Sequence, residues 1–192
     1  MKAQKIVLNL ILIGILFTSC SKDDDLDVIE QTPQYPMKTL IETGHMELKS
    51  TMQQWVFSFE VGYKFKAFKN GKITALGIRV PNNDTYRVTL WNAETEEVLV
   101  TKNIVSSSGL LSFEAINPVN VTSGVAYFVS VNTNDYYTFN DSGNVMFPVE
   151  SGDILITGYG VRSGTNPDQV MPTQYSKTSY VGVVDIKFMP NP

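Results

Sequence analysis

The sequence predicts an all-β fold, an antiparallel β-sandwich or barrel of about ten short strands, from three observations. Short runs that alternate apolar and polar residues recur at roughly 8–12-residue spacing from Trp55 onward. Clusters of Gly, Pro, Asn, Asp and Ser separate these runs, and no stretch after residue 50 shows a helical period. A chain of 192 residues with 43% hydrophobic residues is long enough for one domain with a sizeable core.

The individual strands are predicted from these runs in chain order. Residues 63–68 alternate apolar and basic side chains, and Asn70-Gly71 then predicts a tight hairpin to the next strand. Residues 125–131 are β-branched and aromatic, which predicts a central strand, whereas residues 160–172 predict the longest loop. The predicted strands span residues 55–59, 63–68, 72–80, 86–91, 97–104, 111–115, 125–131, 136–139, 153–159 and 180–188.

Residues 1–19 are predicted to be a secretory signal peptide. Lys2 and Lys5 form a positive end, a largely apolar run spans residues 6–17, and small residues precede Cys20. An uncleaved anchor helix or a buried core helix is the alternative. The run is shorter than the roughly 20 residues that span a bilayer, and a polar segment follows it at once, so cleavage is favoured.

Leu16-Phe17-Thr18-Ser19-Cys20 resembles the lipobox of bacterial lipoproteins. The resemblance implies that Cys20 becomes the first mature residue and carries diacylglycerol on sulfur and a further acyl chain on nitrogen. Several acyl chains anchor a protein stably, because each buried methylene contributes about 0.8 kcal/mol. Cys20 is the only cysteine, so no intrachain disulfide can form.

Residues 20–37 predict a flexible acidic tether, and residues 38–192 predict a single β-sandwich domain. Residues 38–52 fit either a first strand or a cap. Within the tether, Ser21-Lys22-Asp23-Asp24-Asp25 resembles the lysine-plus-acids signal of Bacteroidetes lipoproteins, which implies display on the outer face of the outer membrane. A plain solvated tether is the alternative. We therefore expect a lipid-anchored protein of the bacterial cell envelope, facing the exterior.

The charge balance argues against nucleic acid as a partner. Cleavage before Cys20 removes two of the 15 basic residues and none of the 19 acidic residues, which leaves 13 and 19 and a net charge of −6. The mature chain has no basic run, whereas nucleic-acid binding requires clustered Lys and Arg.

Residues 60–140 resemble the bacterial β-sandwich module known as domain of unknown function 4082. The matching pieces are Gly62-Tyr63-Lys64-Phe65, Gly71-Lys72-Ile73-Thr74-Ala75-Leu76, Tyr86-Arg87-Val88-Thr89-Leu90-Trp91 and residues 117–130. Leu110-Leu111 departs from the family, which tends to place a tryptophan after the glycine. The resemblance implies a jelly-roll-like sandwich of a kind often attached to carbohydrate-active or surface proteins, and it implies no particular ligand.

No enzyme is predicted. His45 is the only histidine and lies near the tether end, and no G-x-S-x-G motif surrounds a serine. Zinc and phosphate-loop motifs do not occur either. A glycosidase would need two facing carboxylates. Most of the candidate acids fall in predicted turns, so a glycoside-active enzyme is the least favoured alternative; the candidates are Glu60, Glu94, Glu96, Glu97, Glu114, Asp135, Asp141 and Asp153.

A structural calcium ion is the one cofactor that the sequence suggests. Calcium takes six to eight oxygen ligands, often from Asp, Asn and backbone carbonyls in loops. Asn82, Asp84, Asn132 and Asp135 supply such oxygens in two predicted turns. The same residues also fit plain turns, which is the favoured interpretation.

Tyrosines are the candidate ligand-binding residues, because sugar faces stack on exposed rings. Tyr136, Tyr137, Tyr159 and Tyr175 are the candidates, each with core packing as the alternative. The predicted function is therefore a surface-displayed lipoprotein with a non-catalytic binding module for glycan or another extracellular polymer. A structural or accessory subunit that contacts another envelope protein is the alternative.

Overall fold

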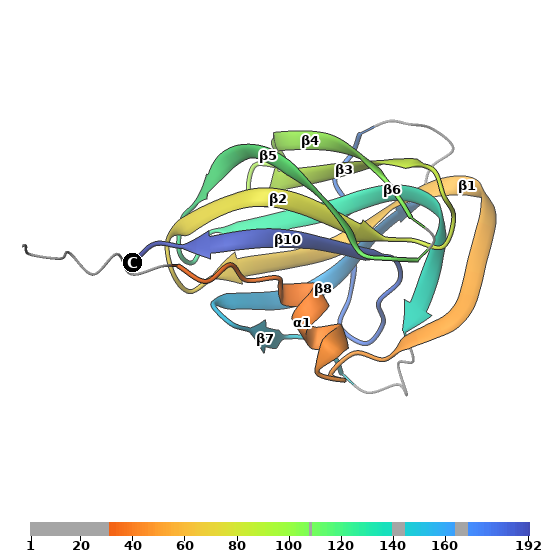
Figure 1. Cartoon of the computed structure of the whole chain (residues 1–192), viewed down its shortest axis with the longest axis horizontal. Coiled ribbons are helices and arrows are strands. Elements are labelled where there is room, and N and C mark those ends of the chain that lie inside the picture. Colours follow the sequence, from red (N-terminus) through yellow and green to blue (C-terminus); the bar gives the residue numbers. More distant parts are fainter. Residues whose placement is uncertain (1–30, 108, 140–144, 164–168) are drawn as a thin grey trace, which may run out of the picture.

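The computed structural model describes residues 31–107, 109–139, 145–163 and 169–192, and it confirms an antiparallel all-β sandwich (Figure 1). The predicted signal peptide, Cys20 and the tether up to residue 30 lie outside these residues. The elements are α1 (Pro36–Glu42), β1 (Leu48–Ala67), β2 (Gly71–Arg79), β3 (Thr85–Asn92), β4 (Val98–Val105), β5 (Ser112–Val121), β6 (Ala126–Phe139), β7 (Val149–Ser151), β8 (Ile154–Ser163), β9 (Gln174–Ser176) and β10 (Val183–Pro190). None of the helices in the described part of the chain is long and apolar enough to cross a membrane.

The ten strands form two sheets that face each other. The larger sheet has seven strands in the order β4-β3-β6-β1-β8-β7, and β9 also pairs with β8. The smaller sheet has three strands in the order β10-β2-β5, and it lies over the middle of the larger one (Figure 1). All pairings are antiparallel, as the alternating sequence pattern requires for sheets with one buried face.

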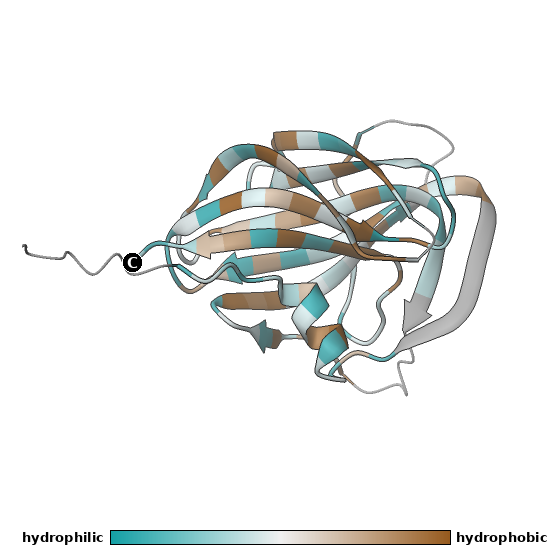
Figure 2. Ribbon diagram, in the orientation of Figure 1, coloured by the Kyte–Doolittle hydropathy of each residue, from teal (hydrophilic) through white to brown (hydrophobic). Residues whose placement is uncertain are grey.

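Alternation along the strands divides residues between the core and the outside. In β1, Val61, Tyr63 and Phe65 are fully buried between the sheets, whereas Gly62 and Lys64 face outward. Figure 2 shows this banding of apolar and polar residues along β2, β5 and β10. Each fully buried large apolar side chain contributes about 1.5–3 kcal/mol, so this core is the main source of stability. Both sheets supply it; its fully buried members include Tyr63, Phe65, Ile73, Leu76, Ile78, Leu90, Phe147, Tyr180, Ile186 and Phe188.

Two pairs of predicted strands are joined in the structure. Residues 55–59 and 63–68 fall almost entirely in the 20-residue strand β1, which has an irregularity in its register between Gln54 and Phe59. A bulge allows a strand to bend without ending, which explains why the sequence suggests two elements. Residues 125–131 and 136–139 likewise belong to β6, which lies between β3 and β1, so the prediction of a central strand is confirmed.

The predicted hairpin at Asn70-Gly71 is wrong. The strands on its two sides, β1 and β2, belong to different sheets, so the chain crosses the sandwich at this point. The Asn70 side chain fixes the crossing by accepting a 2.8 Å hydrogen bond from the backbone N–H of Ser123. A Cβ on Gly71 would lie 2.6 Å from the Phe188 ring, so glycine here allows a close approach of β10 rather than a tight turn.

The fold begins earlier than the predicted boundary at residue 38, which falls inside helix α1. Gln34 and Phe188 exchange two backbone hydrogen bonds of 2.8 and 2.9 Å, and the Gln34 side chain is held by Asp153. Helix α1 then packs against β10 and β7 (Figure 1). The start of the described residues is therefore paired with the last strand. Residues 38–52, which the sequence interprets as a first strand or a cap, include most of this short helix and the beginning of β1.

Candidate functional site on the outer face of the larger sheet

Rows of side chains cross the outer face of the larger sheet, perpendicular to its strands. Strand register places Asn103, Arg87, Asn132, Glu60 and Arg162 side by side on β4, β3, β6, β1 and β8. We call these five residues the polar row. Opposite charges on neighbouring strands attract at this spacing, so the row can hold a charged network on a face that the core does not use.

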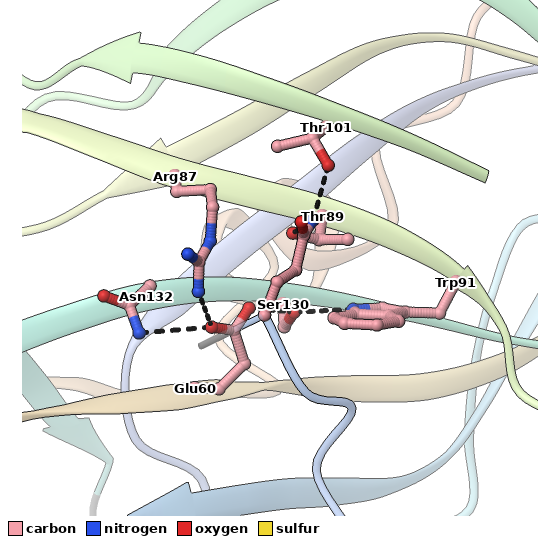
Figure 3. A network of polar contacts seen from close by, with 8 residues as sticks. Glu60, Arg87, Thr89, Trp91, Thr101, Ser130 and Asn132 are labelled. Carbon is pink, nitrogen blue, oxygen red and sulfur yellow. Dashed lines mark hydrogen bonds and ion pairs between the residues drawn. The ribbon is translucent and has the colours of Figure 1, made fainter. Parts of the chain in front are cut away.

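Glu60 is the centre of that network, although a carboxylate on an outer face is normally exposed (Figure 3). Only 3% of Glu60 is exposed. Its carboxylate accepts hydrogen bonds from the Ser130 hydroxyl at 2.6 Å, the Arg87 guanidinium at 3.0 Å and the Asn132 amide at 3.2 Å. Burial raises the pKa of Glu60 above its usual value, although Ser130 and Arg87 act in the opposite direction.

The network extends to Trp91 through Ser130. The indole N–H of Trp91 donates a 2.8 Å hydrogen bond to the Ser130 hydroxyl, which itself donates to Glu60 (Figure 3). Trp91 is buried on the outer face, together with Phe128 and Met171. Trp91 therefore belongs to a small second core that lies outside the larger sheet.

The last part of the predicted loop, residues 169–172, covers this second core. The Gln169 amide donates a 2.9 Å hydrogen bond to the Thr89 hydroxyl and also donates to the hydroxyl of Thr101. Met171 then packs on the Trp91 and Phe128 side chains. The predicted loop at residues 160–172 begins later in the structure, because β8 continues to Ser163, and residues 164–168 lie outside the described part of the chain.

Among the described residues, Tyr175 is the exposed aromatic residue of this face. It lies on β9 opposite Gly160, and 48% of it is exposed. Its ring meets the Phe128 ring edge-on at a centroid distance of 6.2 Å, and the Lys64 ammonium lies 5.5 Å from its centroid. Partial burial, followed by the charge of Glu96, raises the pKa of the Tyr175 phenol. Tyr175 is thus a half-exposed ring that packs on Phe128 and has a cation over it.

The other three predicted ligand-binding tyrosines do not join Tyr175. Tyr136 and Tyr159 point inward and are buried, with 9% and 3% exposed, because their positions on β6 and β8 face the core. The Tyr159 hydroxyl has no hydrogen-bond partner within the described residues, and burial raises its pKa well above the usual range. Tyr137 lies beside Arg79, whose guanidinium is 5.9 Å from the ring centroid. The four residues therefore do not form one aromatic platform.

The four predicted calcium-binding residues are also not gathered into one site. Asp135 is buried, and it accepts hydrogen bonds from the Asn82 backbone N–H at 2.8 Å and the Tyr86 hydroxyl at 2.7 Å. Asp84 accepts from the backbone N–H of Thr85, as a turn residue does. Asn132 points to the opposite face of β6 and donates to Glu60. Hydrogen bonds of the protein itself thus engage the side chains of Asp84, Asn132 and Asp135, and calcium binding stays a prediction.

A second surface feature is a groove of about 430 Å³ between the edge strands β4 and β5. Its charged residue, Lys102, lies 3.9 Å from the Glu114 carboxylate. The groove is lined by Val100, Thr101, Lys102, Ala115, Ile116 and Asn117. Because these residues include no aromatic ring, the outer face with Tyr175 is the stronger candidate for stacking on a ligand.

Two buried carboxylates were not singled out from the sequence. Asp185 is fully buried within the apolar stretch Val183-Val184-Asp185-Ile186. An acid in such a stretch indicates a buried hydrogen-bonding site, because a carboxylate inside a core strand needs several donors. Glu60 was only one of eight candidate carboxylates. Its partners come from β3 and β6, so pairing of distant strands was required to recognise it.

The fold and this covered outer face define an antiparallel β-sandwich module. The family described as Domain of unknown function (DUF4082) matches residues 49–182, which exceeds the 60–140 segment that carries the resemblance in sequence. The chain belongs to this family. No curated protein matches the chain. The matched region runs from the start of β1 to the residue before β10, so it includes the polar row, Trp91 and Tyr175.

Proposed function

We propose that this protein is a surface-displayed lipoprotein whose β-sandwich binds a glycan or another extracellular polymer without catalysis. The observation that carries the proposal is the half-exposed Tyr175 ring, held by Phe128 and flanked by Lys64 on the outer face of the larger sheet. A ring that is already fixed loses little conformational freedom on binding, which favours stacking on a sugar face. The signal peptide, the lipidation of Cys20 and the exterior location are part of the same proposal.

Binding is tested with the full-length chain, purified in a non-ionic detergent, on an array of bacterial, plant and animal glycans. Tyr175→Ala is expected to reduce binding to every glycan that the parent chain recognises. Phe68→Ala is the matched control, because Phe68 is also 48% exposed but lies at the end of β1. Equal losses in the two variants, or the absence of binding across the array, would count against a glycan-binding module.

Lipid anchoring is tested separately in bacterial cells. Metabolic labelling with an alkynyl palmitate analogue is expected to mark the parent chain and not Cys20→Ser. Protease added to intact cells is expected to degrade the parent chain, since the exterior location predicts access. Label on Cys20→Ser would disprove lipidation at this residue, and protection from protease would disprove outward display.

An accessory subunit is the second candidate, and one observation favours it. Val56 and Phe57 on β1 are 91% and 51% exposed, which leaves two adjacent apolar side chains in water. Such residues suit contact with another envelope protein. A photo-crosslinking amino acid at Val56 is expected to give a defined adduct on cells if this function holds, whereas the same probe at Val98, which is 40% exposed, is the control.

A further inference from the structure

The outer face of β1 and β8 carries three cations that form no salt bridge with a described carboxylate. Lys64 and Lys66 lie on either side of the buried Phe65, so both face outward, and Arg162 is exposed on the neighbouring strand β8. The ion pairs within the described residues are Lys38–Glu42, Lys69–Asp153, Arg87–Glu60 and Lys102–Glu114. A chain whose predicted mature form has net charge −6 thus presents, within its described residues, a cationic strip of Lys64, Lys66 and Arg162.

The polar row explains why Arg87 does not belong to this strip. Its side chain is only 20% exposed, and its guanidinium contacts the buried Glu60 carboxylate at 3.0 Å. The pair is therefore internally neutral. Lys64, Lys66 and Arg162 remain as the cations that a ligand on this face would meet, and alternate residues on one strand lie about 7 Å apart.

The Lys64 and Tyr175 side chains form a combined site for a ring that also bears an anionic group. The ammonium lies 5.5 Å from the centroid of the half-exposed Tyr175 ring. An acidic sugar has an apolar C–H face, which stacks on an aromatic ring, and a carboxylate or sulfate that attracts an ammonium. Lys66, further along β1, would meet the acidic group of another sugar in the same polymer.

We propose that the ligand of this face is a polyanionic glycan, with Tyr175 stacking on a sugar ring and Lys64 and Lys66 binding its carboxylate or sulfate groups. This inference rests on the proposed glycan-binding function and specifies its ligand class. Glu96 is the carboxylate whose charge reaches Tyr175, so it opposes such a ligand. Replacing Glu96 by glutamine should therefore strengthen binding.

The test titrates the full-length chain in non-ionic detergent with polygalacturonate, with the same polymer after complete methyl esterification, and with dextran sulfate. Binding to polygalacturonate or dextran sulfate is expected, and the two arms separate carboxylate from sulfate recognition. The methyl ester should bind much more weakly, and added salt should weaken the charged interaction. Lys64→Gln and Lys66→Gln should each weaken binding by about two- to fivefold, as a partly exposed charge pair does.

Lys72→Gln is the matched control, since Lys72 is an exposed lysine on β2 of the other sheet. An equal loss in Lys72→Gln would overturn the proposal, because it would indicate attraction by overall charge. Equal affinity for the acid and the methyl ester, with loss in Tyr175→Ala, would overturn the ligand class and leave glycan binding intact. Binding to neither polymer, or to anionic phosphatidylglycerol vesicles in their place, would also overturn it.

Discussion

The carboxylate of Asp185 accepts a 3.0 Å hydrogen bond from the backbone N–H of Met37, across 148 positions of the sequence. The backbone N–H of Lys38 donates to the other carboxylate oxygen at 2.9 Å. Helix α1 has no side-chain cap of its own, so the last strand of the sandwich caps the helix that precedes the first strand. The Tyr63 hydroxyl, 3.2 Å away, joins the same carboxylate to the middle of the larger sheet.

Asp185→Ala is expected to destabilise the fold by at least about 2 kcal/mol, because buried donors of Met37, Lys38 and Tyr63 lose their acceptor. Urea unfolding measures this loss. Hydrogen exchange at the Met37 and Lys38 amides should also accelerate. Glu114→Ala is the control, since that side chain is 51% exposed and its ion pair spans 3.9 Å. Similar stabilities for the two variants would contradict the capping role of Asp185.

Stability should fall as the pH rises from about 4 to about 6. Burial raises the pKa of Asp185 from 3.8 to about 6, so the folded protein holds this proton more tightly than the unfolded chain does. The stabilisation is complete below the unfolded pKa and is lost as the pH passes the folded pKa, with a total of about 3 kcal/mol. The pKa of Glu60 is raised as well and acts in the same direction.

Unfolding free energies at several pH values between 4 and 7.5 check this dependence. Asp185→Asn should flatten the curve and leave a smaller slope from Glu60. A parent protein that gains stability between pH 4 and 6 would contradict the expected sign.

Ser130→Ala should uncouple Trp91 from Glu60, since Ser130 accepts from the indole and donates to the carboxylate. The expected cost is about 1–3 kcal/mol, because a buried N–H loses its acceptor. The Trp91 indole proton should exchange faster in NMR spectra recorded in a Trp55→Phe background. Ser107→Ala, at an exposed serine, is the control and should leave that proton protected.

Gly71→Ala should destabilise the fold by about 1–3 kcal/mol, as overpacking does in a filled core. The added methyl would lie 2.6 Å from the Phe188 ring and would also meet the Met189 carbonyl oxygen. Gly158→Ala is the comparison, because its nearest contact there would be 3.3 Å from the Ser176 carbonyl oxygen. Thermal unfolding should rank Gly158→Ala as the more stable variant, and the reverse order would disprove crowding at Gly71.

Local alternation was enough to predict the sandwich, because a strand with one buried face repeats every two residues whatever its partner is. It was not enough at Asn70-Gly71, where the same dipeptide serves a tight hairpin or a crossing between sheets. What distinguishes the crossing from a hairpin is the contact of Gly71 with β10, which lies more than 110 residues away in the sequence. Residues 36–42 were missed as a helix because the cap that fixes their start comes from Asp185 and not from a neighbouring residue.

The candidate site was predictable only in part. Tyr175 was among the four predicted tyrosines, and the alternation at residues 63–68 already assigned Lys64 and Lys66 to one face. The burial of Tyr159 depends on its packing against Tyr180 at a centroid distance of 5.2 Å, which no local pattern reports. In the sequence, nothing distinguishes Glu60 from an ordinary surface acid. Only the register of β3, β6 and β1 brings the three hydrogen-bond donors to its carboxylate.

The two backbone hydrogen bonds between Gln34 and Phe188 also have a mechanical consequence. A force applied to the N-terminal segment reaches the folded domain at Gln34. There the two backbone hydrogen bonds to Phe188 and the hydrogen bond from the Gln34 side chain to Asp153 bear the load. Beyond that point, the Asp185 contacts to helix α1 transmit the load to β10, which is hydrogen-bonded along β2. The leading end of the described residues is thus held through β10 and Asp153, and neither of these belongs to the polar row or to the pair of Lys64 and Tyr175.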